Sequence, residues 1–180
     1  MRKSLILAFL ANVALTLVSL AILPDRVATH FGFGGMADGW GSNFGNALFL
    51  TGTHVFLFCA LYFSPQFMLL FPPKLINLPN KDYWLQPAML PQTKAKISGL
   101  IRQYGVMIFA FFFVVGLLAL HANMTKPVRL NETVLFAALG ILLAYSVWWT
   151  IMFYRAFRLP SGQDGASRQM QNAGSQPENN

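Results

Sequence analysis

The chain has 180 residues, of which 55% are hydrophobic and only 11% are charged. So few charged side chains cannot cover a protein of this size with a hydrated surface, which excludes an ordinary soluble domain and favours a membrane protein. The net charge of +7 does not indicate nucleic-acid binding, because the thirteen Lys and Arg residues lie in short groups beside apolar segments. Such groups are typical of topology signals and of contacts with anionic membrane lipids.

The first apolar segment, residues 4–23, follows the basic pair Arg2-Lys3. At about 1.5 Å per residue it can cross a bilayer core of roughly 30 Å. Its length favours a membrane span over a signal peptide. Small and polar side chains recur along it every three or four residues, so one face of this helix should pack against other helices. These residues are Ala8, Asn12, Thr16 and Ser19.

Three further segments, residues 45–71, 99–121 and 132–154, have the length and apolarity of membrane spans. Pro65 predicts a kink or tilt in the second span, and Asn131 is placed to cap the start of the fourth. The predicted fold class is therefore an all-α integral membrane protein with four transmembrane helices.

The remaining segments connect or follow these spans. Residues 24–44 form one loop, and residues 72–98 form another that holds too many prolines for a regular helix through most of its length. The four-helix domain is expected to cover residues 1–155, and residues 156–180, rich in Ser, Gly, Gln and Asn, are expected to be a disordered cytoplasmic tail. The single cysteine, Cys59, is expected to be a buried small side chain.

The distribution of positive charge predicts the orientation of the chain. Ten of the thirteen Lys and Arg residues fall on one side of the predicted membrane, and Arg26, Lys126 and Arg129 fall on the other. Because Lys and Arg accumulate on the cytoplasmic side, both termini and residues 72–98 are expected inside, and residues 24–44 outside. The ten residues are Arg2, Lys3, Lys74, Lys81, Lys94, Lys96, Arg102, Arg155, Arg158 and Arg168.

The outer loop, residues 24–44, combines acids, bases and aromatic side chains with five glycines. Glycine reaches backbone angles that other residues avoid, so this loop can fold tightly. We expect it to be the recognition element for an extracellular ligand. The candidate recognition residues are Asp25, His30, Phe31, Asp38 and Trp40.

No catalytic or metal-binding motif is evident. The three histidines His30, His54 and His121 are expected near the outer side, and so are the acids Asp25, Asp38 and Glu132. Histidines and carboxylates at one membrane face could bind a divalent metal or form a proton-sensitive cluster, but no two possible ligands are spaced to meet on one helical turn. Whether the three histidines cluster is left open by the sequence. The serines lack a GxSxG context, and Cys59 has no nearby base. We therefore predict no catalytic residues, no metal and no cofactor.

The inner loop contains a second dense motif, INLPNKDYWLQP, at residues 76–87. Its Asn and Asp side chains can close turns, and its neighbouring Tyr and Trp can lie at the level of the lipid headgroups. One interpretation is a rigid connector lying along the membrane, and the other is a docking surface for a cytoplasmic protein. The residues of this motif that could take part are Asn77, Asn80, Lys81, Asp82 and Trp84.

These two motifs resemble those of a known family. Leu23-Pro24, His30-Phe31 and Asp38-Gly39-Trp40-Gly41, together with NLPNKDYW after the second span, are similar to motifs of small bacterial multipass proteins. That family shares an N-terminal domain of unknown function with the SdpI-type immunity and signalling proteins. The resemblance covers the first three helices. This chain has Gly32 and Ala37 where the family pattern tends to have Asn and Pro, and it is shorter than the SdpI-type members.

The resemblance implies a multi-pass protein of the bacterial inner membrane that senses, or gives immunity to, an extracellular peptide or envelope stress. A ligand at the outer loop would shift the second helix, which joins the two loops, and so signal to a cytoplasmic partner. The alternative is a small transporter or transporter subunit, with a polar path near Asn12 and His54. The small faces around Gly140 and Ala144 also leave room for a homodimer, in addition to contacts with membrane lipids.

Overall fold

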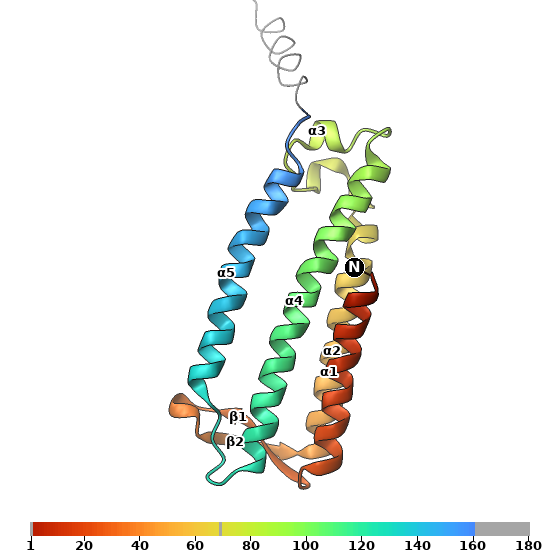
Figure 1. Ribbon diagram of the computed structural model, residues 1–180. Coiled ribbons are helices and arrows are strands. Elements are labelled where there is room, and N and C mark those ends of the chain that lie inside the picture. The colour runs from red at the N-terminus through yellow and green to blue at the C-terminus, as the bar shows by residue number, and fades with distance from the viewer. Residues whose placement is uncertain (1, 69, 161–180) are drawn as a thin grey trace, which may run out of the picture.

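The computed structural model describes residues 2–68 and 70–160 and is built around four long helices. These are α1 (Arg2–Ile22), α2 (Asn43–Met68), α4 (Leu90–Met124) and α5 (Glu132–Ala156), which run side by side (Figure 1). Each is long and apolar enough to cross a membrane, which confirms the expected four spans and indicates a multi-pass membrane protein. Most of the predicted tail, residues 161–180, lies outside the described residues.

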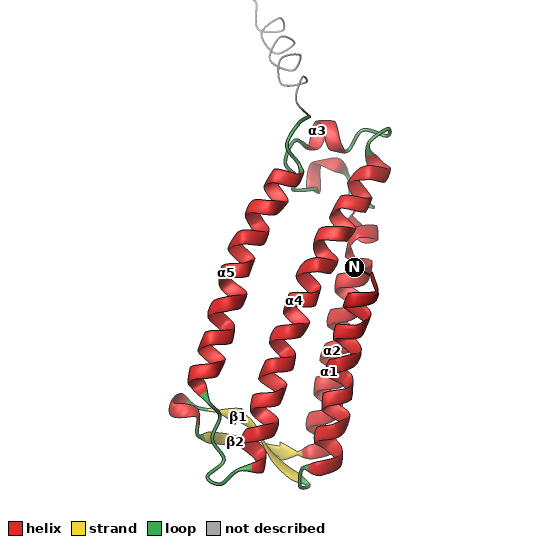
Figure 2. Ribbon diagram, in the orientation of Figure 1, coloured by secondary structure: helices red, strands yellow, loops and turns green. Residues whose placement is uncertain are grey.

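The two ends of the bundle carry different small elements (Figure 2). At one end, which we call the hairpin end, β1 (Arg26–Phe31) and β2 (Ala37–Ser42) form an antiparallel pair joined through the 3₁₀ helix η1 (Phe33–Gly35). At the opposite end, which we call the α3 end, the connection contains η2 (Pro73–Leu75) and α3 (Lys81–Trp84). The expectation of an all-α protein was therefore wrong at the hairpin.

The glycine-rich loop forms a hairpin because its turn uses backbone angles that favour glycine. Gly34 has φ +82° and Gly35 has φ +73°, both in the left-handed region. At Gly35 the space is also closed, since an added Cβ would lie 2.2 Å from the carbonyl oxygen of Leu130. These two glycines reverse the chain, so that Val27 and Ala28 of β1 are buried while His30 stays exposed.

Helix α4 begins earlier than expected, at Leu90 instead of residue 99. Pro91 lies in its first turn, where a helix has no intrahelical partner for the missing N–H and therefore tolerates proline. The 35 residues of α4 correspond to about 52 Å, whereas the 21 residues of α1 correspond to about 32 Å. The first turns of α4 therefore extend beyond the start of α1 at the α3 end (Figure 1).

Helix α4 is the centre of the bundle, since it contacts α1, α2 and α5. It runs parallel to α1 and approaches it closely at two glycines. A Cβ added at Gly105 would lie 2.9 Å from Cδ1 of Leu5, and one added at Gly116 would lie 2.8 Å from Cδ2 of Leu15. Small residues at these positions allow close packing, as in other membrane helix pairs.

The polar face predicted for the first span does pack against other helices. Asn12 and Thr16 are buried, and Nδ2 of Asn12 donates to the carbonyl oxygens of Ala8 and of Phe109 in α4, each at 2.9 Å. Oγ1 of Thr16 donates to the carbonyl oxygen of Asn12. The expectation for Cys59 was wrong, because this residue is exposed on α2. It lies on a different face of that helix from the buried His54.

Helix α5 lies at the edge of the bundle and packs mainly on α4. None of its residues is fully buried. Trp149 Nε1 donates to the carbonyl oxygen of Leu100 at 3.0 Å, and the hydroxyls of Tyr104 and Ser146 form a hydrogen bond at 2.9 Å. The expected N-cap of α5 is confirmed, since Oδ1 of Asn131 accepts a hydrogen bond from the backbone N–H of Val134.

Candidate functional site

The hairpin is attached to the end of α4 by a single side chain. Oδ1 of Asn123 accepts from the N–H of Ala28 at 2.7 Å, and its Nδ2 donates to the carbonyl oxygen of the same residue at 3.1 Å. The amide group thus occupies the edge of β1 as a neighbouring strand would. The other edge is held by the loop between α4 and α5, because the N–H of Ala37 donates to the carbonyl oxygen of Val128 at 3.3 Å.

The tip of the hairpin is held by charged side chains. The N–H of Gly34 donates to Oε1 of Glu132 at 2.9 Å, and Nε of Arg129 donates to the carbonyl oxygen of Gly34 at 2.7 Å. Next to these contacts, the backbone N–H of Leu130 donates to the carbonyl oxygen of Gly35 at 2.8 Å. The first turn of α5 and the preceding loop therefore fix the glycine turn from both sides.

The base of the hairpin is fixed by Asn43, the first residue of α2. Its backbone N–H donates to the carbonyl oxygen of Asp25 at 2.8 Å. Its Nδ2 donates to the carbonyl oxygens of Leu20 and Leu23, which are free acceptors at the end of α1. The structural contribution of Asp25 to the site is thus made by its backbone, and its side chain is exposed.

The remaining candidate residues lie on the exposed surface of this fixed hairpin. Nδ1 of His30 and Oδ1 of Asp38 are 2.5 Å apart, with side chains 73% and 53% exposed. Trp40 is exposed, and the guanidinium of Arg26 lies 5.9 Å from the centre of its ring. Phe31 is half-buried. The structure therefore joins His30 with Asp38, and places Trp40 beside Arg26, a residue that was not among the predicted set.

The exposed surface of the hairpin also includes an aromatic side chain that sequence reasoning did not select. Phe33, at the tip, is fully exposed to the surroundings of the bundle. Of the residues that hold the hairpin, Asn123 and Arg129 were likewise missed, and Glu132 was considered only among the ionisable side chains of the outer side. A signal in the sequence was that Arg129 and Glu132 lie close to the helix cap at Asn131.

The three histidines occupy different surroundings. His30 is on the hairpin, His121 is exposed near the end of α4, and His54 is buried against Phe109 and Phe112. Within residues 2–68 and 70–160, no group of three or more His, Cys, Asp or Glu side chains is close enough to hold a metal ion. Nδ1 of His54 has no hydrogen-bond partner among these residues.

An open cavity of about 580 Å³ lies beside the hairpin tip. It is lined by the end of α4, the α4–α5 loop and the first turn of α5. His121, Arg129 and Glu132 contribute its ionisable side chains, and Gly34 brings the hairpin to its wall. We call this cavity, together with the exposed residues of the hairpin, the hairpin site.

At the α3 end, the predicted inner motif forms the cap of α5. The carbonyl oxygen of Phe157, just after α5, accepts from Nε1 of Trp84 at 2.9 Å and from Nδ2 of Asn80 at 2.8 Å. Nζ of Lys96 donates to the neighbouring carbonyl oxygen of Ala156 and lies 3.8 Å from the centre of the Trp84 ring. These donors satisfy carbonyl groups that a helix end leaves free, and the positive charge is favourable there.

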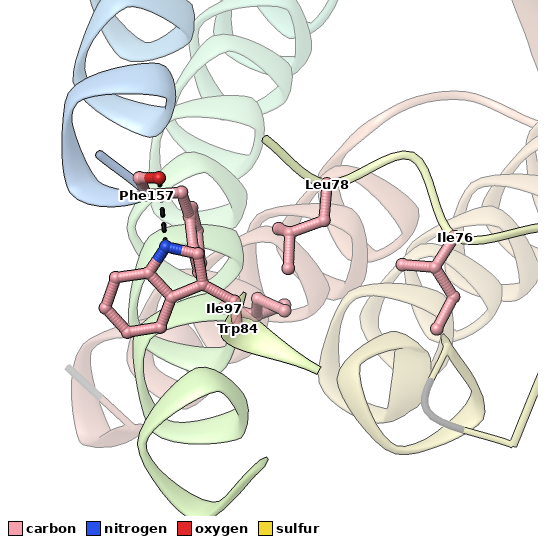
Figure 3. Close-up of a cluster of buried hydrophobic side chains, with 5 residues drawn as sticks. All are labelled: Ile76, Leu78, Trp84, Ile97 and Phe157. Atoms are coloured by element: carbon pink, nitrogen blue, oxygen red, sulfur yellow. Dashed lines mark hydrogen bonds between the residues drawn. The ribbon is translucent and has the colours of Figure 1, made fainter. Parts of the chain in front are cut away.

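An apolar cluster supports this cap (Figure 3). Trp84 is only 2% exposed, its indole N–H points at the Phe157 carbonyl, and Oγ1 of Thr93 donates to the carbonyl oxygen of Trp84 at 2.6 Å. The buried members of the cluster are Ile76, Leu78, Trp84, Ile97 and Phe157.

The residues of the inner motif thus divide into those that build the cap of α5 and those that take no part in it. Trp84 is buried, so it is not available as an exposed anchor for a partner. Asn80 adopts the left-handed conformation, with φ 52°, that presents its amide to Phe157. Asn77 and Asp82 are exposed, and Lys81 is half-buried.

Residues 7–53 match a family model described as Domain of unknown function (DUF1648). The matched segment contains most of α1, the whole β1–β2 hairpin and the first part of α2. It therefore includes every candidate residue of the outer loop, but it ends before the inner motif. No curated protein and no solved structure matches the chain.

Proposed function

We propose that this chain is a non-enzymatic protein of the bacterial inner membrane that binds an extracellular peptide at the hairpin site, and so senses envelope stress or gives immunity to the peptide. The observation that carries this proposal is that the hairpin is held at its edges, tip and base while His30, Asp38 and Trp40 stay exposed. A fixed surface loses little conformational entropy when a ligand binds.

The chemistry of the exposed surface favours a peptide over a small ion. It offers a carboxylate and an imidazole in contact, a guanidinium beside an indole, and a fully exposed phenyl ring at the tip. Aromatic and arginine side chains are the residues that most often dominate binding energy at protein interfaces. The adjacent cavity, with His121, Arg129 and Glu132, adds space for one polar side chain of the ligand.

The orientation in this proposal rests on the positive charges. Arg26, Lys126 and Arg129 are the cations of the hairpin end, and both described termini of the helical bundle belong to the more basic side. The hairpin site then faces outward, and the α3 end faces the cytoplasm.

Helix α4 offers a second route between the two ends, in addition to α2, which joins the two loops directly and fixes the base of the hairpin through Asn43. One end of α4 holds the hairpin through Asn123, and its other end supplies Thr93 and Lys96 to the α3 end. A peptide that moves the hairpin would therefore move α4 relative to the cap at Phe157. The exposed Asn77 and Asp82 would present this change to a cytoplasmic partner.

The transporter alternative loses its main motivation. The side chains of Asn12, Thr16 and Ser19 each donate to a backbone carbonyl oxygen, and the first two are buried between packed helices. These contacts are those of helix packing, and we therefore favour peptide binding over a polar path. A homodimer remains part of the proposal, because Gly140 and Ala144 are exposed on α5, where a second copy could pack.

The test is a growth and binding experiment. The chain is expressed in a sensitive bacterium, which is challenged with envelope-active peptides, and a His30→Ala, Asp38→Ala double variant is compared with wild type. The control is Lys126→Ala, which removes an exposed charge at the same end. Protection by wild type and by the control, but not by the double variant, supports the proposal, and the protective peptide should then bind the purified wild-type chain. Equal growth of all strains contradicts it.

A further inference from the structure

A second cavity lies away from the hairpin site, in the part of the bundle nearer the α3 end. It has a volume of about 340 Å³ and lies between α1, α4 and α5. Its wall on α4 is formed by Arg102, Val106 and Ala110, which follow each other at intervals of one helical turn. Ser4 borders it on α1, and Tyr145 borders it on α5.

Arg102 is the only cationic side chain that lines this cavity in the described part of the chain. Its Nε is buried and has no hydrogen-bond partner among the described residues. A guanidinium nitrogen in such a position is unfavourable unless an acceptor is supplied, because guanidinium groups strongly prefer paired oxygen acceptors. Two further cations lie at the start of α1, where Arg2 lies over the ring of Tyr62 on α2 and Lys3 is exposed.

The level of the cavity matches the boundary of the bilayer. Helix α1 is about as long as a bilayer core is thick, so its start marks one boundary. Ser4 lies in its first turn, and the next residue, Leu5, contacts α4 at Gly105, one turn from Arg102. We therefore expect the guanidinium at headgroup depth, with Val106 and Ala110 leading from it toward the middle of the membrane.

We propose that this cavity binds an anionic phospholipid, with the phosphate on Arg102 and the first part of one acyl chain along Val106, Met107 and Ala110. Arginine recognises phosphate through two parallel hydrogen bonds, and basic pockets between membrane helices bind anionic headgroups. The volume lies at the low end of ligand pockets, roughly 300–1000 Å³, so the rest of the lipid remains in the bilayer. Helix α5 borders the cavity only through Tyr145, so the path along α4 stays open to lipid.

The experiment measures lipid retention by the purified full chain. Nanodiscs contain phosphatidylglycerol and phosphatidylcholine in equal amounts, and lipids that remain after transfer to detergent are counted by native mass spectrometry. The variants are Arg102→Gln, which removes the charge, and Ala110→Phe, which fills the apolar part. The matched control is Arg155→Gln, the same substitution at an exposed arginine on α5.

We expect wild type and Arg155→Gln to retain phosphatidylglycerol in preference to phosphatidylcholine. We expect Arg102→Gln to lose this preference, with retention reduced about tenfold, and Ala110→Phe to reduce retention of both lipids. Folding of each variant is checked by its elution profile and helical circular dichroism, and Arg102→Lys, which keeps the charge, should retain part of the preference.

Three results would overturn the proposal. The first is equal retention of phosphatidylglycerol by wild type and a folded Arg102→Gln variant. The second is an equal loss in Arg155→Gln, which would assign the preference to general surface charge. A parallel titration with soluble glycerol phosphate distinguishes a lipid from a free anion: protection against thermal unfolding by glycerol phosphate as strong as that by the lipid also contradicts a lipid site.

Discussion

The amide group of Asn123 forms hydrogen bonds with both backbone groups of Ala28, accepting from its N–H at 2.7 Å and donating to its carbonyl oxygen at 3.1 Å. One side chain near the end of α4 thus completes the edge of β1. This relationship makes the conformation of the hairpin dependent on a helix that lies far from it in the sequence.

Replacement of Asn123 by Ala should therefore loosen the hairpin more than the bundle. Both backbone groups of Ala28, which is 3% exposed, would lose their partner, at a cost of about 1–3 kcal/mol in the free energy of unfolding. Hydrogen–deuterium exchange of residues 26–42 should become faster, while exchange in α4 should change little. Asn77→Ala, at an exposed asparagine of the α3 end, serves as the control. Unchanged exchange in Asn123→Ala would mean that Asn123 does not hold the hairpin.

Gly34 and Gly35 allow a test of the close approach at the hairpin turn. Both have positive φ, so an alanine at either position should cost about 1–2 kcal/mol of backbone strain. Only at Gly35 would the new Cβ collide with a backbone atom, the carbonyl oxygen of Leu130, whereas the space around Gly34 is open. Gly35→Ala should thus lower the thermal midpoint clearly more than Gly34→Ala. Equal midpoints would show that the α4–α5 loop does not press against the turn.

The contact between His30 and Asp38 should matter little for stability. Because both side chains are more than half exposed, the pair should contribute no more than about 1 kcal/mol. Asp38→Asn is expected to leave the thermal midpoint of the purified protein almost unchanged. A loss of protection in the growth experiment can then be attributed to recognition, whereas a midpoint lowered by many degrees would rule out that interpretation.

The stability of the protein should depend more on the size of the side chain at Trp84 than on its indole N–H. In Trp84→Phe the carbonyl oxygen of Phe157 keeps the hydrogen bond from Asn80, so the cost should stay near 1 kcal/mol. Trp84→Ala leaves a hole in the buried cluster and should cost about 3–5 kcal/mol. Thermal unfolding of the two variants in the same detergent measures the difference, and similar losses would mean that the hydrogen bond, not the packing, dominates.

Apolar replacements of His54 and of Asn12 should have different effects on the stability of the protein. Asn12 donates to the Phe109 carbonyl, and such interhelical hydrogen bonds contribute about 0.6 kcal/mol on average, up to ~1.7 kcal/mol, so Asn12→Leu should destabilise. Nδ1 of His54 has no partner among the described residues, and the ring packs on Phe109 and Phe112. His54→Phe should therefore be neutral or stabilising in thermal unfolding. A large loss in this variant would indicate a water or ligand bound to the imidazole.

The parts of the fold that the sequence predicts are those that depend on local composition. The four spans follow from apolar length, the packing face of α1 follows from the spacing of Asn12 and Thr16, and the cap of α5 follows from the residue type of Asn131. The start of α4 was predicted too late because every proline of residues 72–98 was counted as evidence against a helix. Pro91, however, lies in the first turn of α4, where proline is tolerated.

The hairpin and much of the site depend on contacts between distant residues, which composition does not reveal. β2 contains two glycines, which are unfavourable in strands, and its pairing is supported by Val128 from another part of the chain. His30 and Asp38 were both candidates, but their contact follows from the register of the strands. Trp84 was expected at the headgroups, and it is buried because the end of α5 supplies a carbonyl acceptor for its N–H.

The parallel packing of α1 on α4 has a consequence for the biosynthesis of the protein. Leu5 meets Gly105, a residue that the ribosome adds about a hundred positions later, so α1 must enter the membrane without its principal neighbour. Until α4 is inserted, Asn12 lacks the Phe109 carbonyl and β1 lacks Asn123. The segment of residues 7–53, although matched as a domain, is therefore not expected to be a self-sufficient folding unit.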